Sequence, residues 1–294
     1  MILRYPGGKK KAAEHLVQLI LHGGADETLQ EFREPYCGSA AVALTLLKNP
    51  HFHGHVWLND IDPGIAALWT TVIQNPIELQ SLVQGFTPCV AAYREFKESL
   101  LSPGAFLTEA QRGFRKLALH QMSFSGLGVR AGSPIGGWDQ TGSYKIGCRW
   151  HASNIAGKIE KLHQLLKGRC LQDRCTMLDA IQVIEAPPGD EGAQVALYVD
   201  PPYVQEGAAL YQFGYDSQDQ HRQLAESLRK SSYRWVLSYD DDPLVRELYA
   251  PFQIQEASWA YTINSQENNA GKELIILKGL QDDQRCSFQA LFGF

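Results

Sequence analysis

The chain has 294 residues, of which 44% are hydrophobic and 20% charged, and its formal net charge at pH 7 is −5. This composition is typical of one large globular domain, or of one domain with an insertion, and it excludes a disordered or fibrous chain. No apolar stretch approaches the roughly 20 residues of a membrane-spanning helix, and the first residues lack the apolar segment of a signal peptide. Six scattered cysteines without C-x-x-C spacing argue against a disulfide framework or a zinc site, so we expect a cytoplasmic protein.

Basic residues are concentrated in the middle of the chain. Residues 110–175 hold eleven Lys and Arg against three Asp and Glu, a net charge of +8, which leaves −13 for the remainder. Such an asymmetry indicates a phosphate-binding face on an otherwise acidic protein. An ordinary solvated helical surface is the alternative explanation.

The first half of the chain is expected to be mainly helical. Apolar spacing predicts a helix over 10–22, and a loop of small residues over 34–40 leads into a helix over 41–47. A strand is expected at 55–59, followed by helices at 65–73 and from Pro76. Residues 90–125 should be mostly helical, with a break at 102–104.

Residues 125–150 are rich in Gly, Ser and aromatics, so we expect a long loop or hairpin there, followed by a helix over 155–166. Short buried strands are predicted at 195–199, 235–239 and 274–277, with helices over 218–230 and 243–249 between them. Strand–helix alternation at both ends of the chain predicts an α/β sheet, and the middle of the chain is expected to be an insertion.

Asp200-Pro201-Pro202-Tyr203 directly follows the apolar run 195–199 and is the most specific motif of the chain. A strand that ends there would present the motif at the carboxyl edge of the sheet, where α/β folds bind ligands. Asp200 can accept one N–H of a planar amine, and the carbonyl of Asp200 or Pro201 can accept the other, because prolines have a fixed φ and no N–H to engage it. Tyr203 can stack on the ring that carries the amine. A proline-rich turn without function is the alternative.

A second motif suggests a nucleoside-containing ligand. The small residues from Tyr36 to Ala41 lie between an expected strand and a helix, and Gly38 would let a ligand approach the backbone. Asp60 follows 22 residues later at the end of the next strand, where an acid commonly accepts hydrogen bonds from ribose hydroxyls. No P-loop lysine follows the loop, so a nucleoside without a triphosphate cradle fits better than ATP.

With these motifs the chain resembles the D12 class of adenine-specific DNA methyltransferases, the Dam-like enzymes, in the α arrangement. Ala40 stands where the family usually has a second glycine, and Phe124-Ser125-Gly126 stands where close relatives have Phe-Asn-Gly. The blocks that carry the resemblance are Arg4-Tyr5-Pro6-Gly7-Gly8-Lys9, Glu34-Pro35-Tyr36-Cys37-Gly38-Ser39-Ala40, Leu58-Asn59-Asp60-Ile61-Asp62 and Asp200-Pro201-Pro202-Tyr203, with weaker blocks at Ser238-Tyr239-Asp240 and Lys272-Glu273-Leu274-Ile275-Ile276.

The resemblance implies S-adenosylmethionine as cofactor and a Rossmann-like methyltransferase sheet, with helices on both faces, formed by residues 1–64 and 176–294. It also implies a mainly helical DNA-recognition insertion over 65–175. The implied catalytic residues are Asp200, Pro201, Pro202 and Tyr203. The implied cofactor-binding residues are Tyr5, Gly7, Lys9, Glu34, Pro35, Tyr36, Gly38, Ser39, Asp60, Ile61 and Asp200.

The expected reaction is methyl transfer to the N6 amine of an adenine that is flipped out of double-stranded DNA, with no metal ion. The candidates for DNA contact are Arg130, Trp138, Tyr144, Lys145 and Arg149. Whether the protein works together with a cognate restriction endonuclease stays open. We expect no obligatory protein partner and no association with a membrane. Two other functions stay open: an amino-methyltransferase of the same fold that acts on cytosine N4 or RNA, and a DNA-binding protein with a decayed catalytic site.

Overall fold

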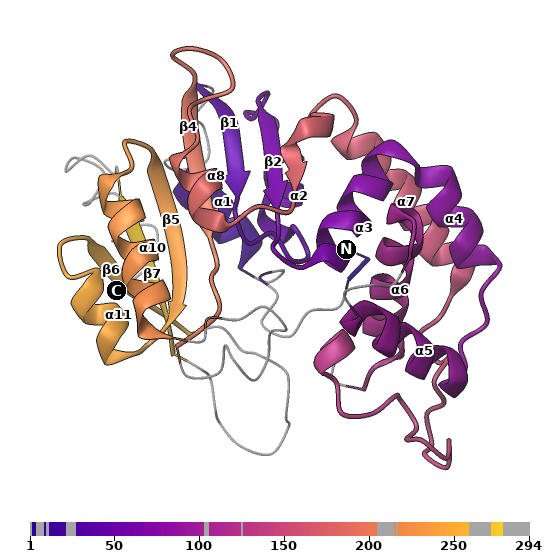
Figure 1. The fold of residues 1–294 in the computed structure, drawn as a ribbon. Coiled ribbons are helices and arrows are strands. Elements are labelled where there is room, and N and C mark those ends of the chain that lie inside the picture. Colours follow the sequence, from indigo (N-terminus) through magenta and orange to yellow (C-terminus); the bar gives the residue numbers. More distant parts are fainter. Residues whose placement is uncertain are drawn as a thin grey trace.

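The computed structural model describes residues 2–3, 9, 12–21, 28–102, 106–124, 126–204, 215, 217–258 and 272–278. Within these residues seven strands form one sheet of order β3-β2-β1-β4-β5-β7-β6 (Figure 1). The first five strands in this order are parallel, and β7 is antiparallel to both of its neighbours. The strands are β1 (Leu29–Glu34), β2 (His55–Asn59), β3 (Cys175–Thr176), β4 (Gln194–Val199), β5 (Arg234–Asp240), β6 (Gln253–Ser258) and β7 (Lys272–Lys278).

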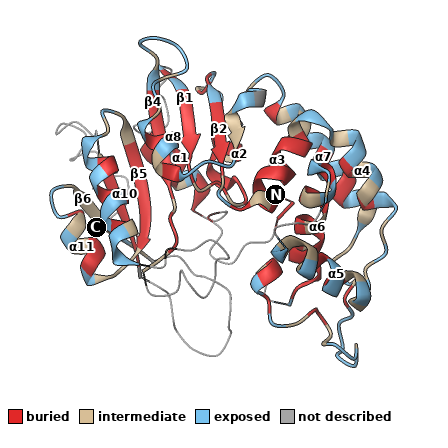
Figure 2. Ribbon diagram, in the orientation of Figure 1, coloured by how far each residue is buried: buried red, intermediate tan, exposed pale blue. Residues whose placement is uncertain are grey.

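Both faces of the sheet are covered by helices. Because successive side chains of a strand point to opposite faces, Ala196 and Tyr198 of β4 join the core shared with α1, whereas Leu197 and Val199 join a second core with Leu224 of α10. The strands β1, β2, β4, β5 and β7 are accordingly buried along most of their length (Figure 2), whereas the described residues of β3 and β6 are only partly buried or exposed. The predicted Rossmann-like α/β fold is confirmed. The helices flanking the sheet are α1 (Ala13–Ile20), α2 (Ala41–Leu46), α8 (Ala180–Glu185), α10 (Gln218–Lys230) and α11 (Pro243–Leu248).

The long segment between β2 and β3 is mainly helical. Its first helix, α3, begins at Pro63, and the Asp62 side chain caps it by accepting hydrogen bonds from the amides of Gly64 and Ile65. Thr108 and Gln111 form a capping box at the start of α6. The segment contains α3 (Pro63–Gln74), α4 (Pro76–Gln84), α5 (Val90–Leu101), α6 (Glu109–Met122), the 3-10 turn η1 (Gly128–Arg130), α7 (Ala152–Leu166) and the 3-10 turn η2 (Gln172–Arg174).

The helical segment and the sheet share one continuous apolar core. Leu58 of β2, Trp69 of α3, Leu117 of α6 and Ile159 of α7 are all buried in the same cluster. Figure 1 shows α4, α5 and α7 on the side of α3 and α6 that is farther from the strands. The inserted helices therefore pack against the sheet as part of the same hydrophobic core.

The segment between α6 and α7 has little regular structure, as the sequence predicted. Apart from η1, its described residues contain one isolated antiparallel bridge, between Ser123 and Pro134. The Gln140 side chain organises it by donating to the carbonyls of Ile135 and Gly137 and accepting from the amide of Ile146. The loop is thus ordered by side-chain hydrogen bonds in place of a strand ladder.

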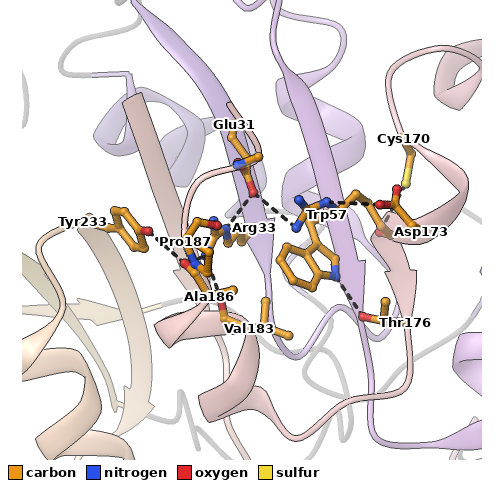
Figure 3. A network of polar contacts seen from close by, with 12 residues as sticks. Glu31, Arg33, Trp57, Cys170, Asp173, Thr176, Val183, Ala186, Pro187 and Tyr233 are labelled. Carbon is orange, nitrogen blue, oxygen red and sulfur yellow. Dashed lines mark hydrogen bonds and ion pairs between the residues drawn. The ribbon is translucent and has the colours of Figure 1, made fainter. Parts of the chain in front are cut away.

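A fully buried arginine joins β1 to the connection between α8 and β4 (Figure 3). The Arg33 guanidinium lies between two rings, with its centre 5.2 Å from the Trp57 centroid and 4.9 Å from that of Tyr233. Such a network of charge-assisted hydrogen bonds replaces the water that burial removes. The guanidinium nitrogens donate to Glu31 Oε1 at 2.8 Å and to the carbonyl oxygens of Val183 at 2.8 Å, Ala186 at 2.7 Å and Pro187 at 2.7 Å.

Candidate active site

Three motifs that are far apart in the sequence follow neighbouring strands of the sheet. The loop 35–40 follows β1, Asp60 follows β2, and Asp200 follows β4, and these three strands are adjacent and parallel. Their carboxyl ends therefore meet at one edge, which is the lower edge of the sheet in Figure 1. In open α/β sheets this edge is the usual place for a ligand.

Asp200 belongs to a buried cluster of charged and hydroxyl groups. Lys9 Nζ lies 2.8 Å from Asp200 Oδ1 and 2.9 Å from Glu273 Oε1. The Tyr203 hydroxyl accepts a hydrogen bond from Lys9 Nζ at 2.8 Å and donates one to Glu273 Oε1 at 2.6 Å. The side chains of Lys9 and Glu273 are 4% and 2% exposed, whereas that of Asp200 is 24% exposed. Among the three charged members of the cluster, Asp200 is thus the one that reaches solvent.

The two oxygens of Asp200 have different surroundings. Oδ1 accepts hydrogen bonds from Lys9 Nζ at 2.8 Å and from Ser238 Oγ at 2.9 Å. Ser238 Oγ is in turn hydrogen-bonded to the Tyr198 hydroxyl at 2.7 Å. Within the described residues, Oδ2 accepts no hydrogen bond. Burial raises the pKa of Asp200, the Lys9 ammonium opposes that rise, and the Glu273 carboxylate adds to it. One oxygen is therefore fixed by the protein and the other is open to a donor.

The residues after Asp200 form a rigid turn. Pro201 and Pro202 are buried and Tyr203 is half-buried. The Tyr203 ring lies 6.3 Å from the Tyr239 ring at an interplanar angle of 35°, and Lys9 Nζ is 5.3 Å from its centroid. The Tyr203 ring consequently packs near Tyr239, and its position is fixed mainly through its hydroxyl.

Asp60 and the loop after β1 form the second part of the site. The amides of Gly38 and Asp62 donate to the two oxygens of Asp60, each at 2.9 Å. Burial, reinforced by the nearby Asp62 carboxylate, raises the pKa of Asp60 to about 6. The carbonyl of Gly38 in turn accepts a hydrogen bond from Trp69 Nε1 at 2.9 Å, which joins the loop to α3.

Alanine fits at position 40, where a second glycine was expected. Ala40 precedes α2 in the left-handed conformation, with φ at 51°, and Gly38 has φ at 45°. Ala40 is completely buried and belongs to the main core. The extra methyl group therefore costs backbone strain, which its apolar burial partly offsets.

Other residues of this loop mainly support it. The buried Glu34 carboxylate accepts a hydrogen bond from the amide of Ala43 at 3.1 Å, and burial raises its pKa well above the usual range. The carbonyl of Pro35 accepts from Asn59 Nδ2 at 2.9 Å, and Ser39 is buried. Tyr36 is half-buried, and its hydroxyl forms a hydrogen bond with that of Tyr215. Tyr5 and Gly7, which were expected to hold a cofactor, lie outside the described residues.

Two features of the site were not foreseen. Asn59, the last residue of β2, uses its amide to join the carbonyls of Pro35 and Leu178, and its side-chain oxygen accepts from the amide of Leu178. Beside Asp60, the predicted cofactor-binding residue Ile61 is 40% exposed, and next to it lie two apolar side chains that were not foreseen, Met177 at 52% and Leu178 at 37% exposed. The sequence did carry a signal for Asn59, which is a polar residue at the end of a buried strand. It carried none for Met177 and Leu178, because the strand that precedes them, β3, is too short to show any periodicity.

The candidate DNA-contact residues all lie in the segment between α6 and α7. Arg130, Tyr144 and Lys145 are exposed, and Trp138 is 40% exposed with its ring against Tyr93 at 5.7 Å. Two of these cations have internal partners, because Lys145 Nζ donates to the carbonyl of Gln140 at 2.5 Å and the Arg149 guanidinium donates to the carbonyl of Ser123 at 3.1 Å. Part of the hydrogen-bonding capacity of Arg149 is therefore used to hold the loop itself.

Several other cations of the basic segment have internal partners. Lys116 is buried and forms an ion pair with Asp62. Arg169 donates to the carbonyls of Phe52 and Gly54, and Arg174 lies 4.3 Å from the Trp57 ring. The charge excess of residues 110–175 thus overstates the number of cations available to a ligand.

Two further searches covered the described residues only. No group of three or more His, Cys, Asp and Glu is arranged to hold a metal ion among them. None of their helices combines the length and the apolar character that crossing a membrane requires.

Comparison with known proteins identifies the family. A model of the D12 class N6 adenine-specific DNA methyltransferase family matches residues 5–263. Comparison with curated protein sequences gives no match. Among solved structures, the chain is similar to the rRNA methyltransferase aviRa from Streptomyces viridochromogenes, with 14% identity, a TM-score of 0.38, and coverage of 94% of this chain and 89% of that chain. The family match spans the loop after β1, Asp60 and the Asp200 motif, and the chain belongs to the D12 class N6 adenine-specific DNA methyltransferase family.

Proposed function

We propose that this methyltransferase transfers a methyl group from S-adenosylmethionine to the N6 amine of adenine in double-stranded DNA. The observation that carries the proposal is the Asp200 carboxylate, whose Oδ1 is fixed by Lys9 and Ser238 while Oδ2 is open at the carboxyl edge of the sheet. Membership of the D12 family supports adenine as the base and DNA as the substrate.

The residues around Asp60 fit the proposed cofactor chemically. After two amide hydrogen bonds, the Asp60 carboxylate keeps lone pairs that can accept from two ribose hydroxyls. The exposed side chains of Ile61, Met177 and Leu178 offer an apolar surface for a purine ring. When bound, S-adenosylmethionine supplies an electrophilic methyl group on a cationic sulfur. The cluster of Lys9, Asp200 and Glu273 carries one excess negative charge, which suits a cation.

The loop after β1 is proposed to hold the amino-acid end of the cofactor. Its left-handed residues, Gly38 and Ala40, turn the chain sharply between β1 and α2. The turn allows close backbone approach at Gly38, and Tyr36 and Ser39 flank it. Tyr5, Gly7 and Lys9 complete the proposed cofactor site. Glu34 and Pro35 support the loop by accepting hydrogen bonds from the amide of Ala43 and from Asn59 Nδ2.

In the proposed mechanism, Asp200 and its neighbouring carbonyl orient the target amine. Oδ2 accepts one N–H of the adenine amine, and the carbonyl of Asp200 or Pro201 accepts the other, so that the nitrogen lone pair is directed at the methyl group. The anionic carboxylate stabilises the positive charge that grows on nitrogen. Pro202 holds the turn, and the Tyr203 ring stacks on the adenine, which must leave the duplex to reach the site.

The inserted segment, residues 65–175, is proposed to recognise DNA. Its loop between α6 and α7 lies at the lower side of the molecule in Figure 1, the same side as the carboxyl edge of the strands. Arg130 and Lys145 are exposed there and can neutralise phosphates, and the exposed rings of Trp138 and Tyr144 can stack or insert between bases. Arg149 can contact DNA with the part of its guanidinium that does not hold the loop.

The proposal is tested by incubating the protein with labelled S-adenosylmethionine and unmethylated bacterial DNA, followed by nucleoside analysis. We expect N6-methyladenine as the labelled product. N4-methylcytosine would overturn the assignment of the base, and binding of the cofactor without a DNA product would direct the search to RNA. A protein that neither binds the cofactor nor methylates DNA would overturn the proposal as a whole.

A further inference from the structure

Glu273 is a buried carboxylate beside Asp200 to which the proposed mechanism gives no role. It lies on β7, the antiparallel strand, and is paired in register with Asp240 of β5. Its side chain is only 2% exposed. A carboxylate so completely removed from water is costly unless its partners compensate for the lost solvation.

The partners of Glu273 are themselves members of the proposed methyl-transfer site. Glu273 Oε1 is 2.9 Å from Lys9 Nζ and accepts a hydrogen bond from the Tyr203 hydroxyl at 2.6 Å. Lys9 Nζ also donates to Asp200 Oδ1 and to the Tyr203 hydroxyl, each at 2.8 Å. Glu273 thus touches both groups that fix the orientation of Asp200 and of the Tyr203 ring.

We propose that Glu273 is a positioning residue for methyl transfer, because it holds Lys9 against Asp200 Oδ1 and the Tyr203 hydroxyl at the back of the site. This inference rests on the proposed function. A lysine has a long flexible stem and three donors, so a second carboxylate is needed to hold its ammonium in one place. With Lys9 held, Oδ1 stays occupied and Oδ2 keeps its orientation toward the incoming amine.

Glu273 also acts on Asp200 through its charge. This effect on the pKa of Asp200 gives an experimental readout that a purely structural role of Glu273 would not change. Among the described residues, the charged groups near Asp200 are the Lys9 ammonium and the carboxylates of Glu273 and Glu34, and the hydroxyls of Ser238, Tyr198 and Tyr203 line the cluster. The negative charge of Glu273 raises the pKa of Asp200. Removal of that charge alone lowers the pKa, so Asp200 stays anionic to a lower pH.

Glu273→Gln therefore has a distinctive expected result in the full-length protein. We expect kcat for DNA methylation to fall about tenfold because Lys9 and Tyr203 lose their fixed partner. The acid limb of the kcat profile should move to lower pH, because loss of the Glu273 charge lowers the pKa of Asp200. The KM for S-adenosylmethionine should rise as well, because the substitution removes the excess negative charge of the cluster of Lys9, Asp200 and Glu273.

Two variants serve as comparisons. Glu273→Asp keeps the charge, so its acid limb should stay at the position of the unmodified protein, with an intermediate kcat. Glu256→Gln is the matched control on the adjacent strand β6, where the side chain is 58% exposed and pairs with Arg246. Both kcat and the acid limb of this control should equal those of the unmodified protein.

The outcomes separate this inference from the proposed function. A Glu273→Gln protein with unaltered kcat and an unaltered acid limb overturns the positioning role, and so does a fall in kcat and in thermal stability without movement of the limb. If this variant does not fold, Tyr203→Phe tests the same contact by removing the hydroxyl that Glu273 accepts from, and full activity of that variant contradicts the inference. If the unmodified protein methylates no DNA, the proposed function itself has failed.

Discussion

Lys9 and Asp200 are 191 residues apart in the chain, yet Lys9 Nζ lies 2.8 Å from Asp200 Oδ1. The contact joins the N-terminal lysine block to the Asp-Pro-Pro-Tyr motif at the edge of the sheet. Because Lys9 also contacts Glu273 at 2.9 Å, a single buried cation compensates two carboxylates. The stability of this edge should therefore depend strongly on Lys9.

Lys9→Met is expected to lower the free energy of unfolding by about 3 kcal/mol near neutral pH, because two carboxylates lose their buried cation. Protonation of a carboxylate relieves that penalty, so the deficit should shrink as the pH falls. Urea unfolding of both proteins at about pH 8 and about pH 5 measures the difference. An equal deficit at the two pH values would show that packing of the lysine stem, and not charge, explains the loss.

Asp60→Asn should remove a charge penalty that the folded protein carries near neutral pH, although it also loses one of the two amide hydrogen bonds, because an amide has a single acceptor oxygen. The pKa of Asp60 is raised to about 6, so its charged form destabilises the fold above that pH and the penalty disappears as the pH falls. Relative to the unmodified protein, the free energy of unfolding of this variant should be about 2 kcal/mol higher at about pH 8 than at about pH 3, and about half of this difference should remain at about pH 5. The same substitution should weaken the binding of S-adenosylmethionine, measured by calorimetry.

Asp62→Asn is the matched control for Asp60→Asn and should have the opposite effect. Burial acts to raise the pKa of Asp62, but the Lys116 ammonium and the amides of Gly64 and Ile65 outweigh it and lower the pKa. The charged form is therefore stabilised, and its removal leaves Lys116 buried without its partner, at a cost of about 3 kcal/mol. Stabilisation by both substitutions would contradict the electrostatic description of this edge.

Arg33→Lys should destabilise the fold without altering the site. A lysine has a single ammonium, which cannot reach Glu31 and the carbonyls of Val183, Ala186 and Pro187 at the same time. We expect a loss of about 3 kcal/mol in urea unfolding. Arg222→Lys, in an exposed ion pair on α10, should change stability by less than about 0.5 kcal/mol. Comparable losses in the two variants would refute the structural role of Arg33.

Arg130→Ala should weaken DNA binding and reduce its dependence on salt. An exposed cation that contacts one phosphate releases about one counterion, so the slope of log affinity against log salt should become shallower by about one. Lys158→Ala, which removes an exposed cation of α7, is the comparison. Equal effects of the two substitutions would indicate a diffuse basic surface in place of a defined contact.

The fold could be predicted where the local sequence determines structure. The strand at 195–199 is a continuous apolar run, the strand at 55–59 has an apolar centre from Val56 to Leu58, and the helix at 218–230 has an apolar stripe, so each was located correctly. The two-residue strand β3 and the edge strand β6, with its sequence QIQEAS, carry no such pattern. These strands form because the rest of the sheet offers them a partner.

The site could be predicted only in part for the same reason. Asp60 and Asp200 follow recognisable strands, so their position at one edge was foreseen. The contacts of Lys9 with Glu273 depend on the antiparallel pairing of β7 with β5, which no local pattern encodes. Composition was also misleading for cations such as Lys116 and Arg169, because the number of lysines and arginines does not reveal which of them are paired internally.

The most direct test of the account compares the unmodified protein with Asp200→Ala in two assays, labelled methyl transfer to DNA and binding of S-adenosylmethionine. Asp219→Ala, which removes an exposed carboxylate of α10, is the control. The account predicts that Asp200→Ala forms no N6-methyladenine while its cofactor affinity stays within about tenfold of the unmodified protein. Methylation by Asp200→Ala at a rate near that of the unmodified protein would contradict it.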